Sequence, residues 1–268
     1  MPAYKDQLNR IINLPAAPKR IISIVPSQTE LLFYLGLSDE VIGITKFCIH
    51  PADKFNSITK VGGTKKLDME LIKQLNPDLI IANKEENERG QVEELIKHYP
   101  VWISDISNLT EALDMIEQVG ELVGKREAAT RLNNLIKNEF DQLSPPAAKL
   151  KVAYFIWRKP YMVAGNGTFI NDLLQKCGVT NVFEKDRYPE ITADELIAAN
   201  PDVVFLSSEP YPFKQKHIEE FRELLPNAKI VLVDGEMFSW YGNRLLYAPK
   251  YFIELLTQLK SMQSGSNR

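Results

Sequence analysis

The sequence has little cysteine: two residues, Cys48 and Cys177, which lie far apart in the chain. Secreted domains that depend on disulfides carry several cysteines at close spacing. We therefore expect no disulfide framework and two unpaired thiols. Histidine is also scarce, with three residues, and a zinc site needs four protein ligands, or three and a water molecule. We therefore assign no metal ligands, and two alternatives stay open: a metal coordinated by the protein, or a metal that arrives inside a chelate.

Long apolar runs and a strong charge of either sign are also absent. A membrane-spanning helix needs about 20 apolar residues, whereas apolar runs here, such as residues 21–25, are short. The net charge is −3 and there is no long basic run, so nucleic acid is not an expected partner. Residues 1–10 lack the apolar core of a secretory signal. Two locations stay open: periplasmic or membrane-surface if a signal has been removed, and cytoplasmic if this N-terminus is native.

What the sequence does contain is a regular alternation of short apolar runs with helical patterns. This alternation predicts parallel βα units. The expected strands are 20–25, 41–47, 79–83, 101–105, 151–157, 161–164, 203–207 and 230–234. The expected helices are 28–35, 68–75, 86–99, 169–176, 193–199, 215–225 and 245–260.

Two local signals refine the helix ends. Ser27 and Glu30 have the spacing of a capping box, which predicts that Ser27 caps the first helix. Gly178 stands where a glycine that ends a helix belongs.

Residues 110–143 contain no strand candidate and form two apolar stripes at helical spacing, separated by Gly124. The second stripe is long enough for one helix to join two domains and limit their relative motion. We therefore expect an N-terminal αβ lobe at 1–109, a helical connector at 110–146 and a C-terminal αβ lobe at 147–268.

A short pattern occurs twice. Residues 76–81 read NPDLII and residues 200–205 read NPDVVF, and an acidic residue, Glu70 or Asp194, precedes each pattern by the same distance. One interpretation is a common helix-to-strand junction that recurs by chance. The other is two lobes built on one plan.

Ligands of open parallel sheets bind beyond the carboxyl ends of the strands. The loops that follow the expected strands are rich in aromatic residues with interspersed charges, a composition suited to large planar ligands. A structural role in the core is the alternative for each aromatic residue. The candidate ligand-binding residues are Cys48, His50, Lys84, Trp157, Arg158, Tyr188, Glu209, Phe238, Trp240, Tyr241 and Arg244.

No enzyme signature stands out. Cys48 and His50 could form a nucleophile pair, but a buried cysteine and a polar loop histidine explain the same residues. Ser207 is not part of a Gly-x-Ser-x-Gly elbow, and the loop at Gly62 and Gly63 lacks the spacing of a phosphate-binding loop. We therefore expect a binding protein with no intrinsic cofactor, and an enzyme using Cys48 and His50 is the less favoured reading.

Residues 18–30 (PKRIISIVPSQTE) resemble the opening strand and first helix of a known family. Residues 4–14, 61–63, 75–81 and 193–205 also fit that family, so the resemblance covers nearly the whole chain. The family is the class III periplasmic binding proteins of cobalamin and ferric-siderophore ABC importers, also called helical-backbone metal receptors.

The resemblance implies an α/β fold with two Rossmann-like lobes, parallel sheets and one long connecting helix. It implies a monomer that captures a corrinoid or a ferric-siderophore chelate in a shallow cleft between the lobes. It also implies docking on an ABC permease through one acidic residue on each lobe, which by motif are Glu70 and Asp194. The alternative is a cytoplasmic corrinoid or tetrapyrrole carrier or sensor that has the same fold and no permease partner.

Overall fold

The predicted strands and helices form two packing units in the computed structural model, which describes residues 2–144 and 150–264. Unit 1 comprises the described part of Met1–Ile106 together with Thr110–Ile136 and Tyr241–Asn243. Unit 2 comprises Ser107–Leu109 and the described parts of Lys137–Trp240 and Arg244–Arg268. Each unit has its own sheet and its own core.

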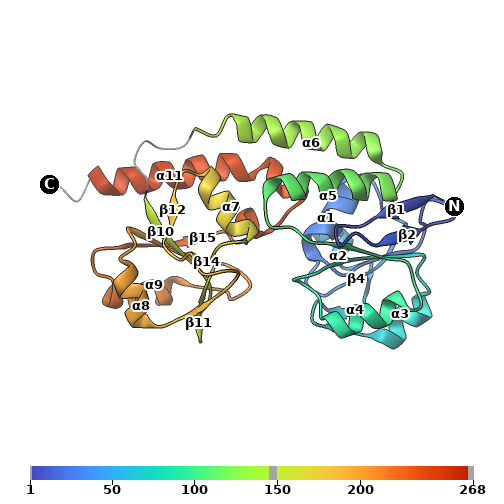
Figure 1. Ribbon diagram of the computed structural model, residues 1–268, viewed down its shortest axis with the longest axis horizontal. Helices are drawn as coiled ribbons and strands as arrows, with labels where there is room; N and C mark the ends of the chain where they lie inside the picture. The colour runs from blue at the N-terminus through green and yellow to red at the C-terminus, as the bar shows by residue number, and fades with distance from the viewer. Residues whose placement is uncertain (1, 145–149, 265–268) are drawn as a thin grey trace. The chain divides into compact units, whose positions relative to one another are not determined.

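Unit 1 is built on a five-stranded parallel sheet of order β5-β4-β3-β8-β9. Its strands are β3 (Ile21–Ser23), β4 (Val41–Ile44), β5 (Thr59–Lys60), β8 (Leu79–Asn83) and β9 (Val101–Ser104). Helices α3 (Met69–Leu75) and α4 (Arg89–Ile96) cover one face, where Ile72, Val92 and Leu95 pack on the strands. Helices α1 (Pro26–Tyr34) and α5 (Leu109–Leu122) lie on the other face (Figure 1).

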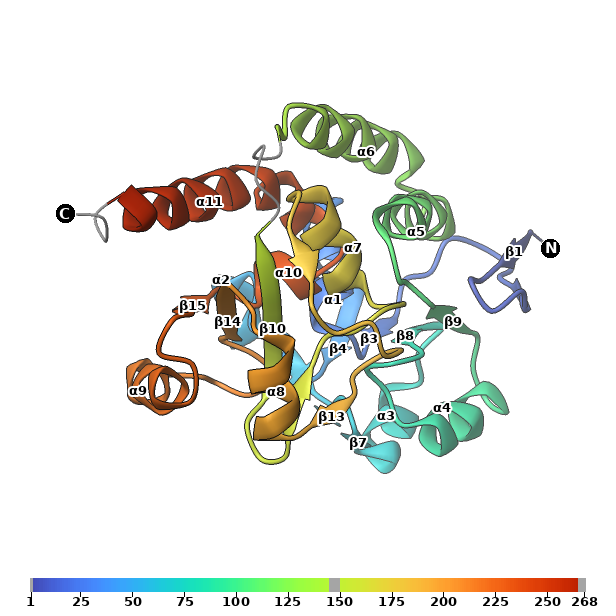
Figure 2. The ribbon, with the colours of Figure 1, turned by 60° about the vertical axis from the view of Figure 1, so that its left-hand side comes forward.

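Three short elements complete unit 1. Strands β1 (Ala3–Lys5) and β2 (Ile11–Asn13) form an antiparallel hairpin, which lies beside β9 (Figure 2). Arg10 holds it there by donating to the carbonyl of Val101 at 2.7 Å. Strands β6 (Gly62–Gly63) and β7 (Lys66–Leu67) form a second hairpin, and α2 (Ala52–Phe55) follows β4.

Unit 2 is built on a mixed sheet of order β13-β11-β10-β14-β15, with β12 also paired to β10. Strands β10 (Lys151–Trp157), β14 (Val203–Ser207), β15 (Lys229–Val233) and β12 (Thr180–Asn181) pair with one another in parallel. Strand β11 (Tyr161–Val163) is antiparallel to β10 and to β13 (Glu190–Ile191). The sequence identified the β11 region as a strand but not its antiparallel direction, which the short β10–β11 connection imposes.

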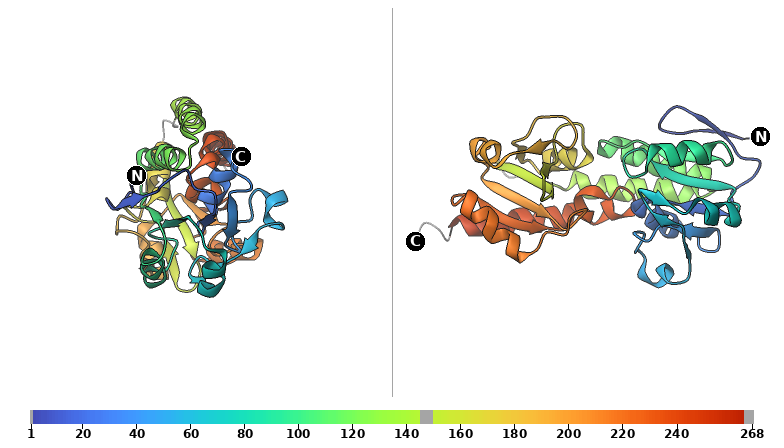
Figure 3. Two further views of the ribbon diagram at one scale, coloured as in Figure 1. Left: turned by 90° about the vertical axis from the view of Figure 1, so that its right-hand side faces the viewer. Right: turned by 90° about the horizontal axis from the view of Figure 1, so that it is seen from below.

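Helices cover both faces of the unit 2 sheet. On one face, α8 (Ala193–Ala199) and α9 (Gln215–Leu224) contribute Leu196, Ile218 and Phe221 to the core. Helices α7 (Phe169–Lys176), α10 (Glu236–Ser239) and α11 (Ala248–Ser264) lie on the opposite face (Figures 1, 2 and 3). A 3-10 helix, η1 (Asn243–Leu246), precedes α11. The α/β class with parallel strands in both units is therefore confirmed.

The region expected as a connector is divided between the units. Helix α5 packs with unit 1, and α6 (Arg126–Asp141) passes from unit 1 to unit 2 after Ile136. Residues 145 and 146 at the end of the expected connector, and the first residues of the expected C-terminal lobe, lie outside the described residues. Across the described ranges, no helix is both long and apolar enough to cross a membrane.

Local differences from the expected elements have physical causes. The capping box at Ser27 was wrong: α1 begins at Pro26, and the residue before it, Val25, has no capping side chain. Proline favours the first helical position because its fixed φ suits the helix and it has no N–H there to leave unpaired. Gly124 and Gly178 adopt the left-handed φ values of +70° and +73° that suit a helix end.

A second helix start also differs. Helix α4 begins at Arg89 and not at residue 86, because Glu88 caps it by accepting from the amides of Gly90 and Gln91. The preceding residues form a turn, in which the Asn83 side chain accepts from the amide of Glu86 at 2.9 Å.

Candidate functional site

The carboxyl ends of β10, β14 and β15 in unit 2 carry five of the eleven predicted ligand-binding residues. Trp157 ends β10 and Arg158 follows it, Glu209 follows β14, and Trp240 and Arg244 follow β15. This edge is where open parallel sheets bind ligands.

Trp157 presents an aromatic surface at the end of β10. Its side chain is 39% exposed, and its indole N–H donates to the Lys159 carbonyl at 3.1 Å. The ring of Tyr211 packs edge-to-face against it at 5.6 Å between centroids. The pair is a partly exposed aromatic platform rather than part of the interior.

Arg158 is held by a carboxylate of α9. Its Nε and Nη2 both donate to Glu220 Oε2, at 2.8 and 2.6 Å. The hydroxyl of Tyr161 donates to the other oxygen, Oε1, at 2.9 Å. Burial alone would raise the pKa of Glu220, but the hydrogen bonds from Arg158 and Tyr161 outweigh it and hold that pKa below its usual value. The carboxylate therefore stays ionised and paired.

The carboxylate of Glu209 connects the loop after β14 with the loop after β15. Glu209 Oε1 accepts from the Ser239 hydroxyl at 2.6 Å and from the Trp240 indole N–H at 2.8 Å. Arg244 pairs with Glu236 at 2.9 Å, and its guanidinium lies 5.0 Å from the centre of the Trp240 ring. These contacts fix the position of the Trp240 side chain and leave it 7% exposed.

Four predicted ligand-binding residues are buried: Cys48, Phe238, Trp240 and Tyr241. Phe238 is fully buried and packs against Tyr154 and Phe252. Cys48 is 1% exposed, and the hydroxyl of Thr29 lies 3.1 Å from its sulfur. Burial raises the pKa of the Cys48 thiol, so it is a poor nucleophile. An apolar run next to a strand does not reveal which of its side chains turns inward. In the structure, Cys48 and Phe238 turn inward, so they contribute to packing and not to a ligand contact.

The remaining predicted residues are more accessible than these four, of which Tyr241 belongs to unit 1. His50 and Tyr188 are half-buried. Lys84 is exposed and forms an ion pair with Asp105 at 2.5 Å. These two residues follow the neighbouring strands β8 and β9.

The loop after β4 contains two residues that the sequence reasoning missed. Phe47 and Ile49 are 50% and 45% exposed, which is unusual for apolar side chains in one loop. They flank Cys48 in the sequence. The side chains of Phe47 and Ile49 point to solvent, whereas that of Cys48 points inward. Two exposed apolar residues at the carboxyl edge of the sheet are a further candidate ligand surface.

A buried polar network under the same edge was also missed. Asn83 Nδ2 donates to the Ser104 hydroxyl at 2.9 Å, and Asn87 Nδ2 donates to the Ile24 carbonyl at 3.0 Å. Gln28 also donates to Ser104. The network fixes the ends of β3, β8 and β9 relative to one another. Its signal in the sequence was the polar residue that ends each apolar run.

The two predicted docking acids occupy equivalent places. Glu70 and Asp194 are exposed residues in the first turns of α3 and α8. Both helices end at an asparagine in the left-handed region, Asn76 with φ of 42° and Asn200 with φ of 45°. The two-lobe interpretation of the repeated pattern therefore agrees with the local structure.

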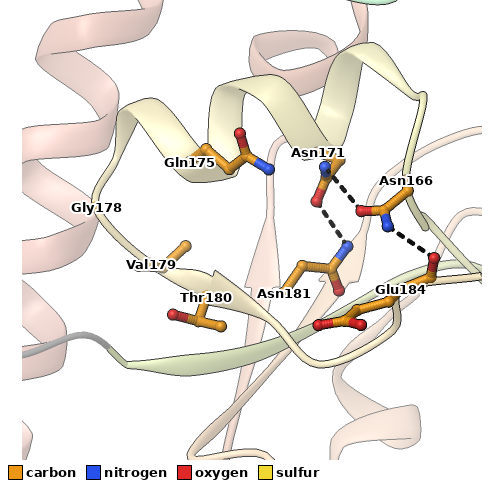
Figure 4. A pocket seen from close by; sticks show the side chains of 8 residues that line it. All are labelled: Asn166, Asn171, Gln175, Gly178, Val179, Thr180, Asn181 and Glu184. Carbon is orange, nitrogen blue, oxygen red and sulfur yellow. Dashed lines mark hydrogen bonds between the residues drawn. The ribbon is translucent and has the colours of Figure 1, made fainter.

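A polar pocket of about 300 Å³ lies between α7 and β12. Its amides bind one another, as Figure 4 shows: Asn181 donates to Asn171 Oδ1 at 3.0 Å, and Asn166 donates to the Glu184 carbonyl at 2.7 Å. Because these side chains brace the surrounding loops, we assign them a structural role. No group of three or more His, Cys, Asp or Glu side chains that could hold a metal occurs in the part of the chain that the structure describes.

Comparison with known proteins identifies the family. The family described as periplasmic binding protein matches residues 21–225. A vitamin B12-binding protein of Pectobacterium carotovorum is 23% identical over 260 residues, which cover 94% of this chain and 92% of that protein. An uncharacterized ABC transporter substrate-binding lipoprotein of Bacillus subtilis is 25% identical over 260 residues, covering 90% of this chain and 81% of that protein.

Among solved structures, the periplasmic heme-binding protein HutB of Vibrio cholerae superimposes with a TM-score of 0.76. It is 20% identical, and the match covers 88% of this chain and 98% of that one. The family match spans most of the chain and includes both units. The chain therefore belongs to the periplasmic binding protein family, as its resemblance to the class III binding proteins of ABC importers predicted.

Proposed function

We propose that this protein captures a corrinoid or a ferric-siderophore chelate and delivers it to an ABC-type importer without changing it chemically. The observation that carries the proposal is the set of partly exposed apolar side chains at the carboxyl ends of the parallel strands. Phe47 and Ile49 follow β4 in unit 1, and Trp157 is the last residue of β10 in unit 2. The names of the relatives, which bind vitamin B12 or heme, support a large planar chelate.

Such ligands match this composition physically. A macrocycle offers broad apolar faces, which aromatic and aliphatic side chains contact, and a polar rim, which needs a few hydrogen-bonding groups. Arg158, Arg244, Lys84, His50 and Tyr188 are the polar groups that we propose for the rim.

Delivery requires a surface that the permease recognises. Glu70 and Asp194 are exposed at equivalent positions of α3 and α8, and we propose that each acid pairs with a basic residue of the permease. Pairing of complementary charges orients two proteins as they meet. In this proposal the protein works outside the cytoplasmic membrane, as a periplasmic or membrane-anchored component.

Isothermal titration with cobalamin, heme and ferric hydroxamates tests the proposal. We expect at least one of these chelates to bind with a Kd in the micromolar range or lower. If none binds more tightly than about 100 µM, which is about 5.5 kcal/mol, the proposed function is wrong. A double variant with Phe47→Ser and Ile49→Ser should weaken binding, and Ile11→Ser, which changes an exposed apolar residue of β2, is the matched control.

A further inference from the structure

The cations of the proposed binding set are already paired with carboxylates of this chain. Arg158 pairs with Glu220 at 2.6 Å and Arg244 with Glu236 at 2.9 Å. Lys84 pairs with Asp105 at 2.5 Å. Each of these three positive charges therefore has a neighbour of opposite sign in place before the ligand arrives.

The ion pair between Arg158 and Glu220 is also stabilised by several hydrogen bonds and by partial burial. Two nitrogens of the guanidinium converge on one oxygen of Glu220, while Tyr161 donates to the other oxygen at 2.9 Å. Both side chains of the ion pair are only about a quarter exposed, at 28% and 27%. A ligand carboxylate that captured Arg158 would leave Glu220 partly desolvated beside a second negative charge, which is strongly unfavourable.

Other charged groups at these edges do not reverse this balance. Glu209 adds a carboxylate, which accepts from Ser239 and Trp240. In unit 1, Lys65 donates to the Glu85 carbonyl, and the exposed side chain of Glu86 adds a further carboxylate near Lys65. Exposed Lys46 and Lys159 lie in the same loops, so carboxylates and cations at these edges are about equal in number.

Resting on the proposed function, we infer that the chelate captured by this protein carries no net negative charge. A neutral chelate whose rim bears amides, or a cationic one, meets hydrogen-bonding groups here without having to break an ion pair. An anionic chelate, whether a tetrapyrrole with free carboxylates or a ferric catecholate, meets carboxylates instead, and juxtaposed like charges select against a ligand.

A panel of chelates that differ in charge tests this inference by isothermal titration. The probes are cyanocobalamin and a neutral ferric hydroxamate, a cationic ferric hydroxamate, hemin, and a ferric tris-catecholate. We expect the tightest neutral or cationic probe to bind roughly tenfold or more tightly than either anion. If an anion binds best, the inference is overturned while the proposed function stands. If no probe binds, the proposed function itself fails.

A charge-neutralising variant tests the role of the ion pair. Glu220→Gln releases Arg158, so we expect the affinity for hemin to rise roughly tenfold and the affinity for the best neutral probe to stay within about twofold. Glu219→Gln is the matched control, because Glu219 lies one position away on α9 and pairs with Arg222 at 2.8 Å. An unchanged ratio of the two affinities in Glu220→Gln would overturn the assignment of selectivity to this pair.

The salt dependence of the Kd is a second test of the inference. It uses the unmodified protein, so its result does not depend on whether a variant folds. Binding of a neutral ligand should be insensitive to ionic strength, because it releases no counterions and rests on no long-range attraction. We expect the Kd of the best neutral probe to change by less than about twofold between low and high salt. An anionic probe that binds most tightly at low salt and loses affinity steeply as salt is added would show that attraction of negative charge drives binding, and would contradict the inference.

Discussion

Trp157 and Phe238 belong to the same predicted ligand-binding set, but their surroundings differ. Trp157 is 39% exposed and Phe238 is fully buried. We expect Phe238→Ala to lower the free energy of unfolding by about 3–5 kcal/mol, because it leaves a cavity among packed rings. Trp157→Ala should lower it by about 1 kcal/mol and should weaken ligand binding. Urea denaturation measures the first quantity and titration the second, and equal losses of stability in the two variants would contradict the assignment.

His217 is a residue whose burial has a consequence for stability. Its side chain is 2% exposed, and its Nδ1 accepts from the Lys214 amide at 2.8 Å, so the neutral ring carries its proton on Nε2, beside the Tyr211 hydroxyl. Burial and the charge of Arg158 lower the pKa of His217 below the usual 6.5. The unfolded chain therefore binds this proton more readily than the folded protein.

The sign of the pH effect follows from that difference. The contribution of His217 to stability is complete above about pH 6.5, the pKa in the unfolded chain, and is lost as the pH falls below it. We expect the urea midpoint to fall between about pH 7 and pH 5, and His217→Gln to flatten this fall. His98→Gln is the control, because His98 is exposed and lies beside Glu94 on α4. A slope that His217→Gln leaves unchanged would refute the prediction.

At the scale of elements, the two asparagines that end α3 and α8 have the same left-handed backbone. Asn76 and Asn200 have φ of 42° and 45°, a region that an alanine adopts at a cost of about 1–2 kcal/mol and that glycine adopts freely. We therefore expect Asn200→Ala to lower stability by about 1 kcal/mol and Asn200→Gly to change it by less than about 0.5 kcal/mol. Thermal or urea denaturation measures whether the alanine variant is less stable than the glycine variant. We expect the same difference in stability between alanine and glycine at position 76. An alanine variant as stable as the glycine variant would contradict the argument.

The existence of most of the longer helices and strands could be predicted from the sequence, because apolar periodicity reports burial directly. The residues at which these helices and strands begin and end could not be predicted. The turn that begins at Thr45 ends β4 three residues before the expected end, where the Cys48 amide donates to the Thr45 carbonyl at 3.1 Å. The side chain of Glu88 similarly sets the start of α4. Such single hydrogen bonds leave no periodic pattern in the sequence.

The candidate site was predictable in position but not in detail. The rule that ligands bind beyond the strand ends located Trp157 and Arg158 correctly at the edge of a sheet. It could not tell that Phe47 and Ile49 are exposed while Phe238 is buried, because that depends on the direction of each loop side chain. Nor could it reveal the pairing of Arg158 with Glu220, which joins residues 62 positions apart in the sequence.

At the scale of the whole molecule, the proposed docking acids predict a separation between binding and transport. We expect a double variant with Glu70→Lys and Asp194→Lys to bind its chelate with a Kd within about twofold of the unmodified protein, because neither residue belongs to the ligand-binding set. Uptake through the cognate permease should fall by roughly tenfold or more, since reversed charges repel the basic partners that the proposal requires.

Titration and uptake into reconstituted proteoliposomes measure the two quantities independently. Glu127→Lys is the matched control, since Glu127 is an exposed acid in the first turn of α6. Normal uptake with the double variant would remove Glu70 and Asp194 from the docking surface.

Unit 1 is not one continuous stretch of the chain, because Tyr241–Asn243 packs with it. Gly242, at φ of +131°, approaches α1 so closely that a Cβ atom there would lie 3.3 Å from the Ser27 carbonyl oxygen. During synthesis, domains generally fold as they leave the ribosome, with the N-terminal one first. Here the N-terminal unit stays incomplete until residues 241–243 have been translated, after most of the other unit, so we expect unit 1 to complete its packing late in synthesis.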